Sequence, residues 1–177
     1  GLLYAMHWPF FQPETSRGVR HSVFHDRLAK EGACFGEMAG WERANWFAPE
    51  GEEPRYEYSY RRQNWFEASA AEHRAVRENV GVFDMSSFGK FLVQGKGSDK
   101  ALNRICANQM AVEPGRVVYT AWLNERGGFE TDLTVTRLAE ETYLVVTAGA
   151  SQIRDLAWLK RQTADTDRVQ VTDVTSG

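Results

Sequence analysis

The chain has 177 residues, of which 42% are hydrophobic and 12% aromatic, and its formal net charge is −3. This length and composition suit one domain with a core, or one domain with a tail, and not a disordered chain. The slightly acidic net charge disfavours a function in nucleic-acid binding. No apolar run approaches the roughly 20 residues of a membrane-spanning helix. The two cysteines, Cys34 and Cys106, lie far apart, which favours a reducing, cytoplasmic compartment.

Residues 1–20 are predicted to form a linker, because Pro9, Pro13 and Gly18 interrupt them and no hydrophobic period is present. Residues 22–31 are compatible with a short helix. The following stretch, residues 35–63, is rich in Gly, Pro, Trp and Tyr. We predict that this stretch is mostly irregular, with one strand at residues 55–60.

Helix signals are clearer from residue 69 onward. Ser69 and Glu72 have the spacing of a capping box, and Gly81 is the expected end of that helix. A short apolar strand at residues 90–94 precedes a second helix, which Ser98 is expected to cap. The inner face of the second helix is predicted to carry Ala101, Leu102, Ile105 and Cys106.

The stretch from residue 115 to residue 137 reads as a β-hairpin. Residues 117–124 and 129–137 alternate between apolar and polar side chains, and a connector with two glycines joins them. In the second strand, one face carries Phe129, Thr131, Leu133 and Val135, and the other carries Glu130, Asp132, Thr134 and Thr136.

The remaining elements complete an α+β pattern. Residues 142–148 are a third β-branched run, and residues 169–174 are a closing strand. Between them we expect a helix at residues 151–162 that turns Ile153, Leu156, Ala157 and Leu159 inward. From residue 90 the order is β-α-β-β-β-α-β, which predicts an antiparallel or mixed sheet of the split β-α-β type with packed helices. Because the sequence stops directly after a strand, we expect it to be part of a larger domain.

Three short motifs have ordinary structural interpretations. His21 and His25 have helical spacing, but no third ligand follows, so we expect no metal site. Residues 95–98 (GKGS) lack the full phosphate-loop spacing and read as a turn before a helix. Arg61 and Arg62 lie near Tyr60 and Trp65 in the sequence. These residues could stack a flat ligand, but an exposed strand end is the simpler interpretation.

Asp132 differs from these motifs, because an acidic residue in mid-strand disfavours the strand. Periodicity alone leaves two alternatives about equally open. The carboxylate lies on a solvated outer face, or it is held rigidly on the sheet to bind an amine and stabilise developing positive charge.

Several blocks of the sequence resemble one known family. Residues 115–119 (GRVVY), 123–128 (LNERGG) and 132–133 (DL) resemble the signature of the folate-dependent aminomethyltransferases, the family of the glycine-cleavage T-protein. Residues 37–47 (EMAGWERANWF) and 86–91 (SSFGKF) are similar to the C-terminal folate domain of dimethylglycine and sarcosine dehydrogenases or oxidases. The resemblance extends from about residue 20 to the end.

The resemblance implies an enzyme of two regions. Residues 1–20 would be the end of a linker from a preceding flavin-dependent region that carries FAD, and residues 21–177 the first part of an aminomethyltransferase-like folate-binding domain. The flavin region would oxidise an N-methyl amine, such as dimethylglycine or sarcosine, to an iminium. The folate domain would pass the one-carbon unit to tetrahydrofolate, giving 5,10-methylenetetrahydrofolate.

The resemblance also assigns residues to a site. Asp132 matches the family's catalytic aspartate, which touches the reacting folate amines, and Tyr119 matches a tyrosine close to the folate. Phe88 and Leu92 match positions that line the ring system, and Thr147 matches a further pocket position. Two matches depart from the family pattern, because Phe88 stands where T-proteins commonly have Met and Thr147 where they commonly have Asn.

Two other functions remain open. One is a folate-binding module without transfer chemistry, and the other is a T-protein or demethylase that uses another donor. In the family, further residues for the pterin and the glutamate tail come later than residue 177. We therefore expect the isolated chain to bind folate weakly and to be inactive.

Overall fold

The computed structural model describes residues 11–166 and 168–176. The chain divides into two compact units, Gly1–Ser87 and Phe88–Gly177, and each has its own sheet. Residues 1–10 of the predicted linker lie outside the described residues. Within the described ranges, no helix is long and apolar enough to cross a membrane.

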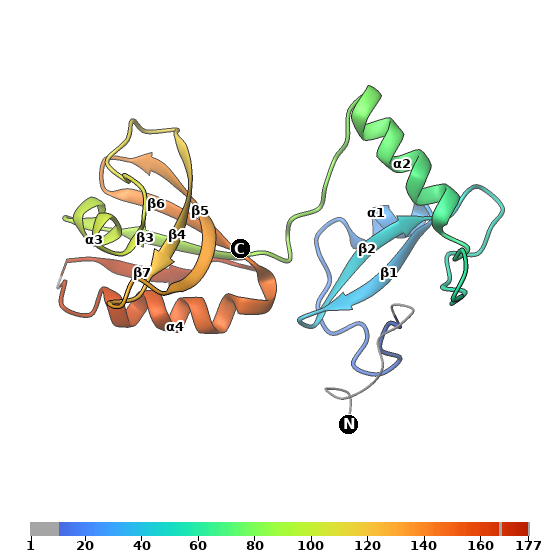
Figure 1. Cartoon of the computed structure of the whole chain (residues 1–177), viewed down its shortest axis with the longest axis horizontal. Helices are drawn as coiled ribbons and strands as arrows, with labels where there is room; N and C mark the ends of the chain where they lie inside the picture. Colours follow the sequence, from blue (N-terminus) through green and yellow to red (C-terminus); the bar gives the residue numbers. More distant parts are fainter. Residues whose placement is uncertain (1–10, 167, 177) are drawn as a thin grey trace. The chain divides into compact units, whose positions relative to one another are not determined.

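The first unit is built on a two-stranded antiparallel hairpin (Figure 1). Its elements are α1 His25–Lys30, β1 Ala33–Met38, β2 Trp41–Phe47 and α2 Phe66–Glu78. The small apolar side chains of Ala33 and Cys34 on β1, and the indoles of Trp41 and Trp46 on β2, are buried. Glu42, also on β2, is buried with its carboxylate paired to Arg17, a residue of the predicted linker.

The predicted irregular stretch at residues 35–63 is therefore wrong over its first part, where β1 and β2 lie. The hairpin turn consists of Ala39 and Gly40, which have φ values of 52° and 84°. Positive φ at both positions is the geometry of a two-residue turn that matches the twist of the strands, and its usual signal is Asn-Gly or Asp-Gly. The Ala39-Gly40 turn lacks this Asn-Gly or Asp-Gly signal, so the hairpin could not be predicted from the sequence.

The strand predicted at residues 55–60 is also wrong, because the segment pairs with no strand among the described residues. Its tyrosines pack against other rings instead. The Tyr56 and Tyr58 rings are 5.7 Å apart, and the Tyr56 ring meets Trp65 edge-on at 5.2 Å. The Tyr56 hydroxyl accepts a 2.7 Å hydrogen bond from Asn45 on β2, which attaches this segment to the hairpin.

Helix α2 begins one turn earlier than the capping box predicts. Trp65 is its N-cap residue and Asn79 its C-cap residue, so neither Ser69 nor Gly81 bounds the helix. Glu72 has another role, because its Oε1 accepts a 2.8 Å hydrogen bond from the Phe47 amide. The carboxylate thus joins α2 to the end of β2.

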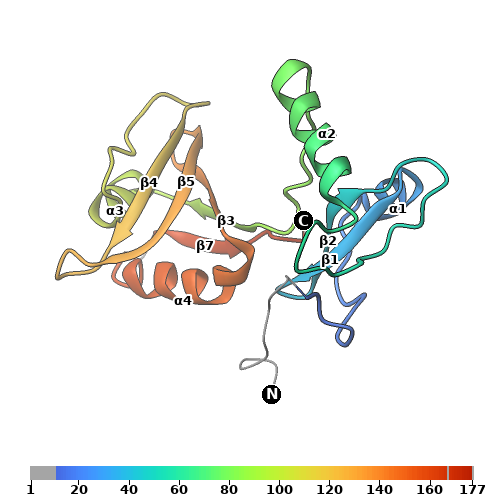
Figure 2. The same cartoon turned by 45° about the vertical axis from the view of Figure 1, so that its right-hand side comes forward.

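The second unit is a five-stranded antiparallel sheet in the order β4-β5-β6-β3-β7 (Figures 1 and 2). The strands are β3 Gly89–Gln94, β4 Val117–Leu123, β5 Phe129–Ala139, β6 Thr142–Thr147 and β7 Gln170–Asp173. The helices are α3 Ser98–Ile105 and α4 Gln152–Gln162, and a short 3₁₀ turn, η2 Gly149–Ser151, precedes α4. This arrangement confirms the predicted α+β fold and the predicted hairpin.

Both helices of this unit pack on the same face of the sheet. Leu102 and Ile105 of α3 and Trp158 and Leu159 of α4 form one buried core with side chains of β3, β4, β5 and β6. The indoles of Trp122 and Trp158 stack at 4.9 Å between ring centroids. The strand residues of this core are Phe91, Val93, Trp122, Leu133, Val135, Tyr143 and Val145.

Two details of the predicted helices are wrong. The N-cap of α3 is Gly97, with φ 90°, and Ser98 is the first helical residue. In α4, Ile153 is 83% exposed and Ala157 is also exposed, whereas Asp155 and Trp158 are buried. The helix is turned so that Asp155 faces the sheet, because hydroxyl donors on β5 and β6 meet its carboxylate there.

Candidate functional site

The face of the second unit's sheet that lies opposite α3 and α4 is here called the outer face. Strand pairing places residues on it in rows, because directly paired residues of antiparallel strands point to the same side. One row contains Tyr119 opposite Thr134, and Thr134 opposite Val146. The neighbouring rows contain Ala121 with Asp132, and Val117, Thr136, Leu144 and Leu92.

Tyr119 and Asp132 form a direct pair on the outer face. The phenol donates a 2.7 Å hydrogen bond to Oδ2 of Asp132. The residues belong to adjacent rows, so the bond runs diagonally between β4 and β5, a distance that a long side chain spans. Tyr119 is 66% exposed, and Asp132 is exposed as well, so both polar groups are accessible from solution.

The hydrogen bond changes the acidity of the phenol. The pKa of Tyr119 is raised above its ordinary value, first because its proton is shared with the Asp132 carboxylate, and second because ionisation would place two negative charges side by side. At neutral pH the pair therefore consists of a neutral phenol and a carboxyl group that accepts its hydrogen bond.

The structure brings together only some of the predicted site residues. Leu92 shares the outer face with Tyr119 and Asp132, but it lies on β3, two strands from β5, which corresponds to about 10 Å across the sheet. Phe88 is half-buried and directly precedes β3. Thr147 is 1% exposed and pairs with Leu133, so its side chain lies on the helix-covered face and away from Asp132.

Thr147 belongs to a buried polar cluster that sequence reasoning missed. Its hydroxyl donates a 2.5 Å hydrogen bond to Oδ2 of Asp155, which is 2% exposed. The same oxygen accepts hydrogen bonds from Ser151 at 2.6 Å and from Thr131 at 3.3 Å. Arg154 donates to the other oxygen through Nε at 3.0 Å and Nη2 at 2.9 Å. These five residues, Thr131, Thr147, Ser151, Arg154 and Asp155, are called the Asp155 cluster.

A buried carboxylate is costly unless donors satisfy it, and here both oxygens are satisfied. The sequence contains a partial signal, because Ser151 and Asp155 are four residues apart at the start of a helix. The participation of Thr131 and Thr147 depends on strand pairing, which the sequence does not display.

A shallow cavity of about 570 Å³ lies beside Tyr119 at the edge of β4. It is lined mainly by the loop that precedes this strand, including Asn108, Glu113 and Arg116. Asn108 joins the loop to the strand, because its Nδ2 donates to the Tyr119 carbonyl at 3.2 Å and its amide donates to Thr120 Oγ1 at 3.1 Å. Tyr119 is thus accessible from this cavity as well as from the outer face.

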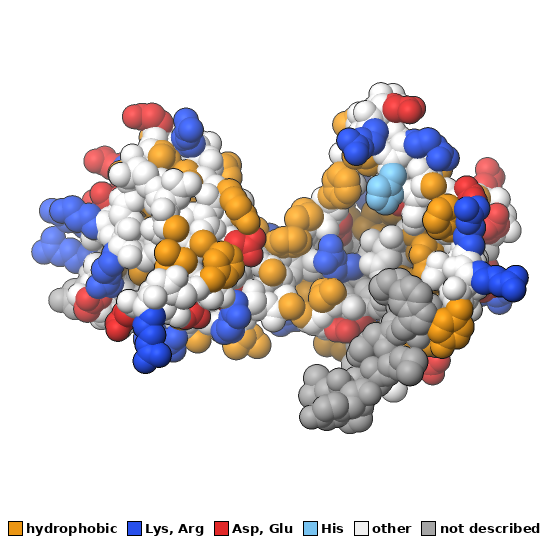
Figure 3. Space-filling view, viewed as in Figure 1, with side chains coloured by type: hydrophobic (Ala, Val, Ile, Leu, Met, Phe, Trp, Pro, Cys, Tyr) orange, Lys and Arg blue, Asp and Glu red, His pale blue; other side chains and the backbone are white. Residues whose placement is uncertain are grey.

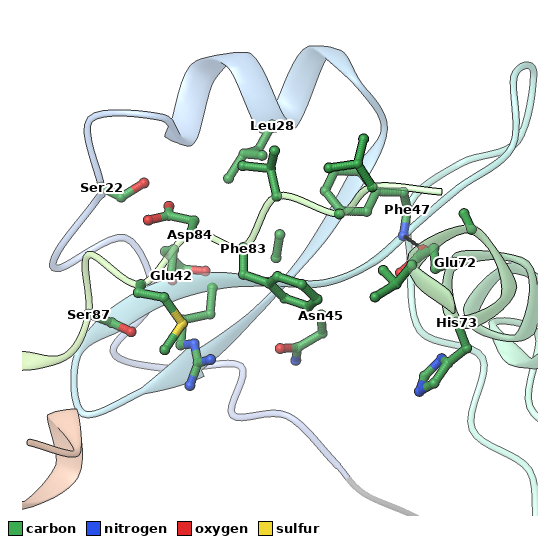
Figure 4. A pocket seen from close by; sticks show the side chains of 18 of the residues that line it. Ser22, Leu28, Glu42, Asn45, Phe47, Glu72, His73, Phe83, Asp84 and Ser87 are labelled. Atoms are coloured by element: carbon green, nitrogen blue, oxygen red, sulfur yellow. Dashed lines mark hydrogen bonds between the residues drawn. The ribbon is translucent and has the colours of Figure 1, made fainter. Parts of the chain in front are cut away.

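A second cavity, of about 550 Å³, lies within the first unit, and none of the predicted site residues lines it. Figure 4 shows Phe47, Glu72, His73 and Phe83 around it, with Glu72 bonded to the Phe47 backbone. Hydrophobic side chains are visible at the surface around α2 and the segment that follows it (Figure 3), and those exposed there include Val80, Val82, Phe83 and Met85.

Metal ligands do not gather in the part of the chain that the structure describes, where no group of three or more His, Cys, Asp or Glu side chains could hold an ion. His21 and His25 stack on each other, with ring centroids 3.8 Å apart, and His25 also packs against Phe35. Arg62 lies 4.2 Å over the ring of Phe66. The two imidazole rings and the Arg62 guanidinium thus pack against neighbouring side chains of the same unit.

The fold defines the class of protein. A crystal structure of the glycine cleavage system aminomethyltransferase T from Bartonella henselae superimposes with a TM-score of 0.71 over 89% of this chain and 39% of that chain, at 24% identity. The chain therefore has the aminomethyltransferase fold. It belongs to the GCVT N-terminal domain family, whose model matches residues 24–177.

Similar proteins include enzymes that act on methylated amines. The 4-methylaminobutanoate oxidase (formaldehyde-forming) of Paenarthrobacter nicotinovorans is 49% identical over 91% of this chain, and the mitochondrial dimethylglycine dehydrogenase of Rattus norvegicus is 36% identical over 76%. The chain spans only 20% and 16% of the lengths of these relatives. It is an aminomethyltransferase-like domain related to enzymes that oxidise N-methyl amines, which confirms the resemblance found in the sequence.

Proposed function

We propose that this chain is the first part of a folate-binding domain that passes a one-carbon unit from an oxidised N-methyl amine to tetrahydrofolate. Residues 21–177 would belong to that domain, and residues 1–20 would lead from a flavin-dependent region that carries FAD. The observation that carries the proposal is the accessible Tyr119–Asp132 pair, fixed on adjacent strands of the outer face. The two oxidising relatives named above support the choice of amine class.

The outer face suits a flat, amine-bearing ligand. Asp132 offers a carboxylate for amine hydrogens, and Tyr119 offers a hydroxyl and a ring on an exposed residue. Val146 and Leu144 on β6 and Leu92 on β3 extend the same face as half-buried apolar side chains. A carboxylate beside a patch of aliphatic side chains combines orientation by hydrogen bonds with apolar contact area.

Tetrahydrofolate would supply the two amines that take up the one-carbon unit, and the products are 5,10-methylenetetrahydrofolate, the demethylated amine and one proton. Asp132 would accept that proton and offset the positive charge carried by the one-carbon donor. Tyr119 would hold the Asp132 carboxylate in a single rotamer, because its hydroxyl occupies Oδ2. Oδ1 then remains available to the reacting amines.

The proposal is tested by Asp132→Asn in a protein that contains both this chain and its flavin-dependent region. With an N-methyl amino acid as substrate, we expect amine oxidation to proceed at the parental rate. Formation of 5,10-methylenetetrahydrofolate is expected to fall by about 100-fold, and formaldehyde is expected to accumulate instead. Flavin reduction, folate product and formaldehyde are measured separately.

Glu130→Gln is the matched control, because it removes the same charge two residues away on β5. Its folate product should stay near the parental amount. If Asp132→Asn forms 5,10-methylenetetrahydrofolate at the parental rate during amine oxidation, the proposed role of Asp132 is refuted. Tight folate binding without transfer from any N-methyl amine would instead indicate a non-catalytic folate-binding module.

We further propose that the isolated chain binds tetrahydrofolate weakly, because it spans about a fifth of the relatives' lengths and 39% of the related aminomethyltransferase. Titration calorimetry with tetrahydrofolate checks this. A dissociation constant in the micromolar range for the chain alone would overturn the expectation.

A further inference from the structure

Asp132 lies in a part of β5 that pairs with a neighbouring strand on one side only. The pairing of β5 with β6 begins at Leu133–Thr147, so it does not reach back to residue 132. On the other side β5 pairs with β4 at Ala121–Asp132 and Trp122–Thr131, and the register then shifts between Trp122 and Leu123. A register shift locally disrupts the ladder and bends the strand. The backbone that carries Asp132 is thus less constrained by strand pairing than the middle of β5.

The Asp155 cluster lies beside the part of β5 that no longer pairs with β6. Arg154 Nη2 donates a 3.0 Å hydrogen bond to the Glu130 carbonyl, as a strand amide would. Thr131 donates to Asp155 Oδ2 at 3.3 Å from the helix-covered face. The two residues that precede Asp132 are therefore both attached to the start of α4.

The same carboxylate also ties this point of β5 to the end of β6. Thr147, the last residue of β6, donates to Asp155 at 2.5 Å, and Ser151 of η2 donates at 2.6 Å. Asp155 therefore joins three segments that diverge at this corner of the sheet: β5, the end of β6 and the turn into α4.

We propose that Asp155 is a positioning residue for Asp132: it holds β5 directly at Thr131 and, through Arg154, at the Glu130 carbonyl, and thereby keeps the Asp132 carboxylate within hydrogen-bond distance of Tyr119. Strand alternation places Thr131 beneath the sheet and Asp132 above it, so fixing one side chain fixes the direction of the next. Reactive groups must be held to within about 0.5 Å to be effective, which is the degree of control that a second layer of hydrogen bonds supplies. For catalysis this inference rests on the proposed function, whereas the positioning itself does not.

The positioning is tested in this chain without any ligand, by the titration of Tyr119. A fluorinated tyrosine label reports the ionisation of each phenol by ¹⁹F NMR, and Tyr119→Phe assigns its signal. Asp132→Asn gives the Tyr119 pKa in the absence of the carboxylate. In Asp155→Asn we expect the Tyr119 pKa to fall. The decrease should be at least half of the difference between the Tyr119 pKa of the parent and that of Asp132→Asn.

Thr131→Val separates geometry from charge, because it keeps the shape and every charge but removes one donor to Asp155. We expect it to lower the Tyr119 pKa in the same direction, by a smaller amount. If Asp155→Asn does not fold, Thr131→Val alone tests whether the Asp155 cluster positions Asp132. Asp165→Asn is the matched control, since Asp165 pairs with Arg104 and lies outside the cluster, and it should leave the Tyr119 titration unchanged.

An unchanged Tyr119 titration in folded Asp155→Asn, or in Thr131→Val, would mean that the cluster only anchors α4, and would overturn the inference. In the flavin-containing protein, Asp155→Asn should lower kcat for methylenetetrahydrofolate formation by about 10- to 100-fold with little change in KM. It should add almost nothing when combined with Asp132→Asn. If Asp132→Asn has no effect on transfer while Asp155→Asn still shifts Tyr119, the proposed function fails and the positioning stands.

Discussion

The hydroxyl of Tyr119 lies 2.7 Å from Oδ2 of Asp132, and the two residues come from adjacent rows of the β4–β5 hairpin. This diagonal pair converts the polar face of the hairpin into a defined site, because it orients one carboxylate oxygen and leaves the other free.

The first prediction concerns the titration of Tyr119. Its pKa is raised by the hydrogen bond to Asp132. An acid whose pKa is higher in the folded state contributes stability below the unfolded value, about 10 for tyrosine, and loses it as pH rises through the folded value. Asp132→Asn should therefore move the Tyr119 pKa down toward 10, as measured by ultraviolet difference spectra of the phenolate. Glu130→Gln should not move it.

The second prediction concerns Glu42 in the first unit. Arg17 donates to both carboxylate oxygens of Glu42, at 2.9 Å and 2.5 Å, and the Gly18 amide donates at 2.6 Å. The guanidinium of Arg17 and this amide lower the pKa of Glu42 to about 2, against the desolvation that burial causes. The stabilisation is present above the unfolded pKa of about 4.3, and it is lost as pH falls from there toward 2.

Glu42→Gln should accordingly lower the free energy of unfolding of the first unit by about 1–3 kcal/mol at neutral pH. Amide hydrogen exchange of β1 and β2 measures this locally, at neutral pH and at acid pH, where the difference should vanish. Glu50→Gln, at an exposed glutamate, is the control. Equal exchange rates in Glu42→Gln and the parent at neutral pH would contradict the prediction.

The third prediction concerns the packing of α4. Trp158 is 6% exposed and stacks on Trp122, which is fully buried. Trp158→Ala should cost about 3–5 kcal/mol, because the cavity it leaves beneath the sheet cannot collapse fully. Ile153→Ala on the same helix should change the stability by less than about 0.5 kcal/mol, since that side chain is 83% exposed. Urea unfolding followed by circular dichroism compares them, and similar midpoints for the two variants would show that the stack is unimportant.

The fourth prediction concerns Gly95, between β3 and α3. Its φ is 114°, and a Cβ atom there would collide with the Arg168 backbone carbonyl. Gly97 has a φ of 90° and open space around it. Gly97→Ala should cost about 1 kcal/mol for the left-handed backbone alone. Gly95→Ala should cost at least about 2 kcal/mol more, because the segment before β7 must move. Thermal unfolding of both variants measures the difference, and equal melting temperatures would contradict it.

The sequence by itself determined the elements whose signals are local. The alternation in residues 117–137 predicted the hairpin and placed Asp132 on the face opposite Leu133 and Val135, and the order of elements predicted the α+β fold. The short blocks around Tyr119 and Asp132 were also enough to indicate the family. These features repeat within a few residues, so the neighbouring sequence is sufficient to reveal them.

Only the tertiary structure decided where the remaining polar groups lie. Thr147 lies on the helix-covered face of the sheet, and Asp155 is buried on the side of α4 that faces the sheet, whereas the predicted inward residues Ile153 and Ala157 are exposed. The reason is that a buried carboxylate is tolerated only where donors converge on it. Here the donors come from β5, β6, the turn before α4 and Arg154 of α4 itself, and strand pairing brings the first two together. Asp132 was recognisable from its place in the hairpin, but the contacts that hold its backbone join residues that are 24 positions apart, Thr131 with Asp155 and Glu130 with Arg154.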